Sequence, residues 1–168
     1  MIAMNQESST SLNRARKVKN KAFAYITNRN RLLVFIHPFA PEAGIQVPAG
    51  TVKANELPEE AVSRSREAFE ETGLSDLIVD GFLGEYERDM SDFGKDEIHH
   101  RYFYHLRCEG NPPDNWRHEE RDSFDDPKPI PIMFEFFWAP LSEGVPSLIA
   151  DHGEMIPQLL KKLSLGST

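Results

Sequence analysis

Residues 31–37 form the segment that most limits the folds open to this chain. Every position from 32 to 36 is apolar, so both alternating faces of a strand built from this segment need cover. Residues 22–27 form a second β-prone segment, and residues 28–30 between them have the sequence Asn-Arg-Asn. Because Asn tolerates left-handed backbone geometry, the two segments are predicted to form a hairpin whose second strand is covered on both sides.

The rest of the chain alternates strand-like and helical patterns. A helix is predicted to begin at Pro58 and to run to about Thr72, with Gly73 ending it in the left-handed capping conformation. Strands are predicted at residues 45–47, 77–86, 98–107 and 132–138. A second helix is predicted over residues 148–163, from the helical spacing of Ile149, Ile156, Leu159, Leu160 and Leu163. The pattern indicates an α/β fold, with helices packed against a mixed sheet.

Two regions lack periodicity. Residues 1–20 are polar and end in scattered Arg and Lys residues without the apolar stretch of a secretory signal. They are predicted to form a solvated tail or a short leading helix, with a nucleic-acid-binding arm as the alternative. Residues 109–131 are rich in Pro, Asp and Asn, and they are predicted to form an irregular loop that is functional or partly mobile. The folded domain is expected to cover residues 21–165.

Composition excludes several classes of protein. A length of 168 residues favours one domain. The 19 Lys and Arg residues against 27 Asp and Glu give a net charge of −8, which argues against a stable complex with nucleic acid. No apolar run approaches the ~20 residues that span a bilayer. The single cysteine, Cys108, excludes an internal disulfide and makes the cytoplasm the expected location; Cys108 itself is expected to be buried rather than nucleophilic.

Three carboxylates share one side of the first predicted helix. On a helical wheel with Glu67 at zero, Glu71 falls at about +40° and Glu70 at about −60°. The opposite side carries a stripe for burial, made of Ala61, Val62, Ala68, Phe69 and Thr72. Like charges at this spacing destabilise a helix by ~0.2–0.5 kcal/mol per pair, and a bound divalent cation would reverse that sign. Oxygen ligands suit Mg²⁺ or Mn²⁺, although a merely solvated acidic face remains the alternative.

The segment from Gly50 to Leu74 resembles the Nudix hydrolase box. The matching positions are Gly50, Glu56, Arg66, Glu67, Ala68, Glu70, Glu71, Gly73 and Leu74. Nine residues separate Glu56 from Arg66, two more than the family pattern has. The two extra residues are expected in the loop or in a bulged first turn, because inside the helix they would rotate the later glutamates away. Asn55 stands where the family usually has Gly, and Asn is the next best residue for a positive φ. With the flanking strands and residues 137–141, the resemblance covers residues 22–163.

The resemblance implies a Nudix-type α/β/α sandwich and an enzyme dependent on Mg²⁺ (or Mn²⁺). Water would cleave a phosphoanhydride bond of a nucleoside diphosphate derivative. Glu67, Glu70 and Glu71 would bind the metal, with Glu70 as the first choice for the base and Arg66 orienting the carboxylates. The catalytic assignment is thus Glu70, Arg66 and Glu67. Glu135 is a further candidate ligand or base, with an outward-facing strand acid as the equal alternative.

The remaining assignments are weaker. The partner is expected to be a nucleotide-type small molecule, bound by Gly50, Phe39 and Tyr86, while Phe93, Tyr102 and Trp116 are further aromatics that rim a pocket or fill the core. A homodimer is compatible with the family. His99 and His100 point to opposite faces of a strand, which disfavours a shared metal. The alternative functions are a catalytically silent Nudix-fold module that binds nucleotide or regulates, and an acidic domain without a ligand.

Overall fold

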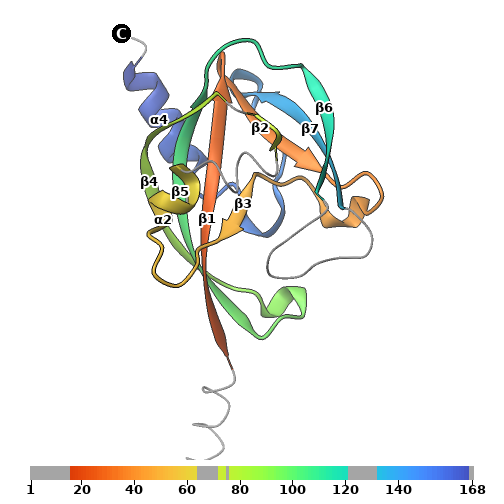
Figure 1. Cartoon of the computed structure of the whole chain (residues 1–168), viewed down its shortest axis with the longest axis vertical. Helices are drawn as coiled ribbons and strands as arrows, with labels where there is room; N and C mark the ends of the chain where they lie inside the picture. Colours follow the sequence, from red (N-terminus) through yellow and green to blue (C-terminus); the bar gives the residue numbers. More distant parts are fainter. Residues whose placement is uncertain (1–15, 64–71, 75, 121–131, 167–168) are drawn as a thin grey trace, which may run out of the picture.

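The computed structural model describes residues 16–63, 72–74, 76–120 and 132–166 (Figure 1). Its centre is a seven-stranded mixed sheet in the order β4-β5-β1-β2-β7-β6, with β3 paired to β1 beside this path. The strands are β1 (Lys17–Asn28), β2 (Arg31–Ile36), β3 (Ala49–Thr51), β4 (Leu77–Asp89), β5 (Glu97–Cys108), β6 (Asn115–Glu120) and β7 (Ile132–Pro140). The helical elements are η1 (Pro41–Ala43), α2 (Pro58–Ser63), η2 (Ser91–Phe93), η3 (Leu141–Glu143), η4 (Ile149–Asp151) and α4 (Ile156–Gly166).

Strand β2 is covered on both faces, as its sequence predicts. Leu33 and Phe35 belong to the core cluster that also contains Ala61 and Val62 of α2. The intervening Leu32 and Val34 belong to a second cluster, which contains Leu159 of α4. Helices therefore pack on opposite faces of the sheet, which confirms the predicted α/β fold and its layers.

The predicted hairpin is confirmed. Asn28 of β1 pairs with Arg31 of β2, so the turn consists of Arg29 and Asn30 alone. Both residues have positive φ, 52° and 60°, which is the left-handed geometry of a two-residue turn that matches the twist of the strands.

Two predictions for the N-terminal part of the sheet are wrong: the start of the first strand and the strand at residues 45–47. Strand β1 begins at Lys17 rather than at residue 22, because its polar first residues run parallel to β5 from the pair Lys17 and Glu97 onward. Backbone pairing stabilises this extension, where the side chains are exposed. The strand predicted at residues 45–47 is reduced to one bridge between Gln46 and Phe35; the strand proper is β3, which pairs with β1.

Two later elements also differ from the prediction. Strand β6 lies inside the stretch predicted to be an irregular loop, because its pairing with β7 overrides a weak local pattern. Helix α4 begins at Ile156 rather than at residue 148. The reason is that Ala150 and Asp151 both have left-handed φ, 49° and 59°, which a regular right-handed α-helix does not admit.

Two buried histidines fix segments that are distant in sequence. His105 of β5 lies 2.7 Å from Thr27 Oγ1 and 2.8 Å from Lys162 Nζ of α4. His152 accepts a hydrogen bond from the Val47 amide at 3.2 Å. Burial, together with the charge of Lys162, lowers the pKa of His105 to about 4. Burial, together with the charge of Arg101, lowers the pKa of His152 to about 3.

None of the helices within the described ranges has both the length and the apolar character needed to cross a bilayer.

These histidines predict a loss of stability in mild acid. Their folded pKa values lie below the ~6.5 of an unfolded histidine, so the unfolded chain takes up protons first as the pH falls. The free energy of unfolding should therefore decrease from about pH 6.5 to about pH 4, by about 3 kcal/mol for His105 alone. Denaturant titrations across this range measure the loss, and NMR of the His105 ring locates its pKa. A ring midpoint near that of a free histidine would contradict the prediction.

Candidate active site

The acidic segment, residues 50–74, is described except for residues 64–71. Arg66, Glu67, Glu70 and Glu71 lie outside the described residues, so their placement stays a prediction. On the near side, α2 begins at Pro58 as expected, and Ala61 and Val62 are buried. On the far side, Thr72 is fully buried and Gly73 has a left-handed φ of 76°. The buried positions are those that the helical wheel places opposite the carboxylates.

The turn before α2 has the conformation expected of the box. Asn55 has a φ of 68°, as predicted for the residue that replaces the usual Gly. The Lys53 amide donates to Glu56 Oε1 at 3.1 Å, and the Glu56 amide donates to the Lys53 carbonyl at 3.1 Å. Glu56 therefore closes the turn with both its side chain and its backbone.

Strand β6 holds the end of the acidic segment. The indole nitrogen of Trp116 donates to the Thr72 carbonyl at 2.8 Å, and the Trp116 ring stacks on Phe136 with centroids 5.2 Å apart. A Cβ at Gly73 would lie 3.2 Å from Nδ1 of His118, so this strand approaches the segment closely. Sequence reasoning placed Trp116 only among possible rim aromatics, because β6 itself was not predicted.

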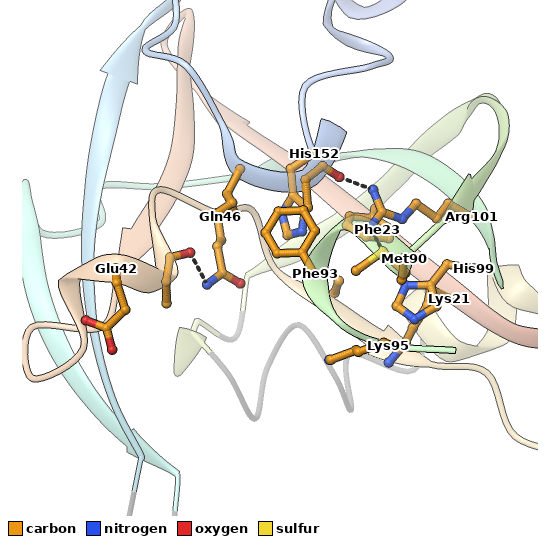
Figure 2. A pocket seen from close by; sticks show the side chains of 14 residues that line it. Lys21, Phe23, Glu42, Gln46, Met90, Phe93, Lys95, His99, Arg101 and His152 are labelled. Carbon is orange, nitrogen blue, oxygen red and sulfur yellow. Dashed lines mark hydrogen bonds between the residues drawn. The ribbon is translucent and has the colours of Figure 1, made fainter. Parts of the chain in front are cut away.

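A cavity of about 360 Å³ lies beside β3, on the side of the sheet that carries α4 (Figure 2). Its walls come from β1, β3, β5 and from the loops around η1, η2 and η4. The lining residues are Lys21, Phe23, Glu42, Ala43, Gln46, Ala49, Met90, Phe93, Lys95, His99, Arg101, Ile149, Ala150 and His152. Three of these side chains are cationic and one is a carboxylate, although the chain as a whole carries −8. The cavity therefore suits an anionic ligand.

Arg101 is the most buried of the cavity's cations, with 1% of its surface exposed. One terminal nitrogen donates to the Ala150 carbonyl, and the other lies 3.6 Å from the Met90 sulfur. The guanidinium carbon lies 4.8 Å above the ring of Phe23. Burial and the nearby charge of Arg88 lower the pKa of Arg101 to about 10, so it stays protonated at neutral pH.

An ion-pair network fixes the rim of the cavity. Arg88 donates to Asp92 Oδ1 and Oδ2 at 2.9 and 2.8 Å, and to Asp151 Oδ2 at 3.0 Å. Tyr86 donates to the same Asp151 oxygen at 3.1 Å. Since Asp92 is in η2 and Asp151 is in η4, the network joins the loops that carry Phe93 and Ala150.

The cavity wall leads directly into the acidic segment. Ala49 lines the cavity, and Gly50 pairs with Ala22 in the ladder between β3 and β1. Lys21 Nζ donates to Thr51 Oγ1 at 2.8 Å. From Thr51 the chain continues to Pro58, where α2 starts on the face of the sheet opposite the cavity.

The other predicted binding residues lie at different distances from the cavity. Gly50 is buried in the strand beside its wall. Tyr86 is outside the lining but is bonded to Asp151, next to the lining residue Ala150. Phe39 is 80% exposed and outside the lining. Phe93, which the sequence suggested only as a possible rim aromatic, lines the cavity.

The candidate ligand Glu135 lies on β7, where it pairs with Arg117 of β6 at 3.3 Å. His100 bonds to Glu85 and stacks on Tyr102, whereas His99 bonds to Glu97 and lines the cavity. Within the described ranges, no group of three or more His, Cys, Asp or Glu side chains could hold a metal ion. Cys108 is buried as expected, and burial raises the pKa of its thiol.

Comparison with known proteins identifies the architecture. The NUDIX domain profile matches residues 18–159. The crystal structure of a UDP-X diphosphatase aligns with a TM-score of 0.58 and 13% identity, covering 95% of this chain and 71% of that one. A MutT NUDIX hydrolase from Burkholderia pseudomallei aligns with a TM-score of 0.56 and 21% identity, covering 85% and 98%. The MutT protein from Methanosarcina mazei Go1 gives 0.57 and 17%, covering 88% and 96%. No curated protein sequence matches the chain.

The hydrogen bond from Trp116 to Thr72 predicts that substitutions of the two tryptophans affect metal binding differently. Trp116→Phe removes one indole donor and should lower the free energy of unfolding by about 1 kcal/mol. Trp138→Phe is the matched control, because Trp138 also donates one indole bond, to the Pro113 carbonyl at 2.9 Å. Both variants should lose similar stability in denaturant titrations, but only Trp116→Phe should weaken Mn²⁺ binding. Equal Mn²⁺ affinity in the two variants would contradict the role given to Trp116.

Proposed function

Because the chain belongs to the NUDIX domain family, we propose that it is a Mg²⁺-dependent hydrolase that uses water to cleave a phosphoanhydride bond of a nucleoside diphosphate derivative. The family assignment supports a hydrolase that acts on acid anhydrides. The observation that carries the substrate class is the cationic cavity beside β3 in a chain whose net charge is −8. Such a cavity favours a ligand rich in phosphate oxygens.

The donor set fits a hard divalent cation. Glu67, Glu70 and Glu71 offer carboxylate oxygens alone, which suits Mg²⁺ or Mn²⁺ better than Zn²⁺. The part of the chain that the structure describes offers no competing cluster of ligands. A bound Mg²⁺ or Mn²⁺ would neutralise charge on the phosphates and acidify the attacking water.

The chain's own residues orient the substrate and accept the proton. Glu70 is the proposed base that takes the proton from the attacking water, and Arg66 orients Glu67 and Glu70. Glu135 is a second candidate ligand or base, whose pairing with Arg117 would have to open first. Buried Thr72 accepts a hydrogen bond from Trp116, which fixes the C-terminal end of the stripe opposite the carboxylates.

The cavity is the proposed site for the nucleotide part of the substrate. Phe93 lines the cavity, is 44% exposed overall and offers an aromatic ring for stacking. Gln46 contributes a side-chain amide, and its Nε2 already donates to the Ala43 carbonyl at 3.2 Å. Gly50, Tyr86 and Phe39 remain proposed substrate contacts at the edges of the cavity. A cytoplasmic location and a homodimer are also part of the proposal.

A catalytically silent Nudix-fold module is the second candidate. The two extra residues between Glu56 and Arg66 favour it, whereas the presence of all three box glutamates disfavours it. A silent module would bind a non-hydrolysable nucleotide equally well with and without Mg²⁺, and a hydrolase would bind it more tightly with the metal.

Substitution of the box glutamates tests the catalytic assignment. Glu70→Gln and Glu71→Gln should each reduce turnover by orders of magnitude, because they remove a metal ligand or the base, while the unfolding transition stays in place. Glu59→Gln is the matched control, since Glu59 is an exposed glutamate of α2. Unaltered turnover in both box variants, or an equal loss in the control, would remove the assigned roles.

A panel of nucleoside diphosphate derivatives tests the reaction. With Mg²⁺ the protein should release phosphate or a nucleoside monophosphate from at least one member, and chelation by EDTA should abolish the release. Product identification by mass spectrometry fixes the bond that is cleaved. No release from a broad panel, by protein whose fold is verified, would contradict catalysis.

A further inference from the structure

The sheet register places two cations of the cavity directly opposite each other. In the parallel ladder between β1 and β5, Lys21 pairs with Arg101. Side chains at paired positions share a face, and like charges placed opposite one another destabilise a sheet. Lys95, from the loop after η2, adds a third positive charge to the same cavity.

Arg101 differs from the paired arginines of the described part of the chain. Each of those has a carboxylate within 4 Å; they are Arg16, Arg31, Arg88, Arg107 and Arg117. Arg101 is more deeply buried than they are, yet no ion pair joins it to a described carboxylate, and its Nε has no hydrogen-bond partner. Burying a charge without a counter-charge is costly.

The nearby carboxylates are directed elsewhere. Asp151, the residue after Ala150, accepts hydrogen bonds from Arg88 and Tyr86. Glu42 lies at the opposite end of the cavity from Arg101 (Figure 2). The charge of Asp151 acts on Arg101 from a distance, but no described carboxylate forms an ion pair with it, so an oxyanion of a ligand would be its first direct counter-charge.

We infer that Arg101, assisted by Lys21 and Lys95, binds an oxyanion of the substrate, either a phosphate or a carboxylate. The charge of the site selects substrates that carry this oxyanion over neutral analogues. A neutral base or sugar would satisfy hydrogen bonds but would leave the buried charge uncompensated. That the oxyanion belongs to the hydrolysed substrate rests on the proposed function; that the cavity binds an oxyanion does not.

Binding in EDTA tests this inference apart from hydrolysis. Calorimetry compares two matched pairs of ligands, AMP against adenosine for a phosphate, and UDP-glucuronate against UDP-glucose for a carboxylate. The wild-type protein should prefer the charged member of at least one pair, which identifies the source of the oxyanion. Arg101→Gln should reduce that preference by roughly tenfold or more, as expected when a charge-assisted hydrogen bond is lost.

Three further variants separate recognition from folding. Arg107→Gln is the matched control, because Arg107 lies on the same strand but is paired with Asp80 and Glu109 outside the cavity; it should keep the preference. Arg101→Lys keeps the charge and should retain part of the preference. Exposed Lys95→Gln should weaken it without affecting the melting temperature, which keeps the test valid if Arg101→Gln does not fold.

The outcomes are distinct for the two claims. No preference in the wild-type protein for either charged ligand, a preference unchanged in Arg101→Gln and Lys95→Gln, or an equal loss in Arg107→Gln would each overturn the inference. An Arg101-dependent preference without hydrolysis of any nucleotide would support the oxyanion site and refute the proposed function. Hydrolysis without an Arg101-dependent preference would support the proposed function and overturn the oxyanion site.

Discussion

The parallel pairing of β1 with β5 is the constraint on which the rest of the molecule depends. It joins Lys17–Asn28 to Glu97–Cys108, so β2, β3, α2 and β4 all lie in the connection between two neighbouring strands. Parallel neighbours require such a crossover. The acidic segment is part of this connection, and β3 fastens its start to β1. The pairing thereby places the box glycine, Gly50, beside a cavity whose floor is formed by both central strands.

The two faces of β1 serve different purposes. On one face, Ala22 and Ala24 are small and leave room for Ala61 and Val62 of α2. On the other face, Phe23 stacks on Phe103 at 4.8 Å, and Tyr25 donates to the His152 carbonyl at 2.6 Å. Packing and hydrogen bonding on this second face hold the segment before α4 and close the cavity from that side.

The sequence predicts what depends on local pattern and misses what depends on pairing. Alternation, Asn and Gly predict the cover of β2 and the left-handed turn residues. They also predict most of β4 and β7, as residues 77–86 and 132–138. The polar start of β1 and the whole of β6 exist because neighbouring strands bind them. Arg101 could not be singled out among 19 Lys and Arg residues, since its burial and its position opposite Lys21 follow from register.

The central claim is that the box glutamates bind a divalent cation. NMR of the protein during titration with paramagnetic Mn²⁺ tests it most directly, because signals near the ion broaden first. The account predicts early broadening of the amide signals of Ala49–Thr51, Thr72 and Gly73. Early broadening near Asp80 or Asp92 instead, with Thr72 and Gly73 still sharp, would contradict it.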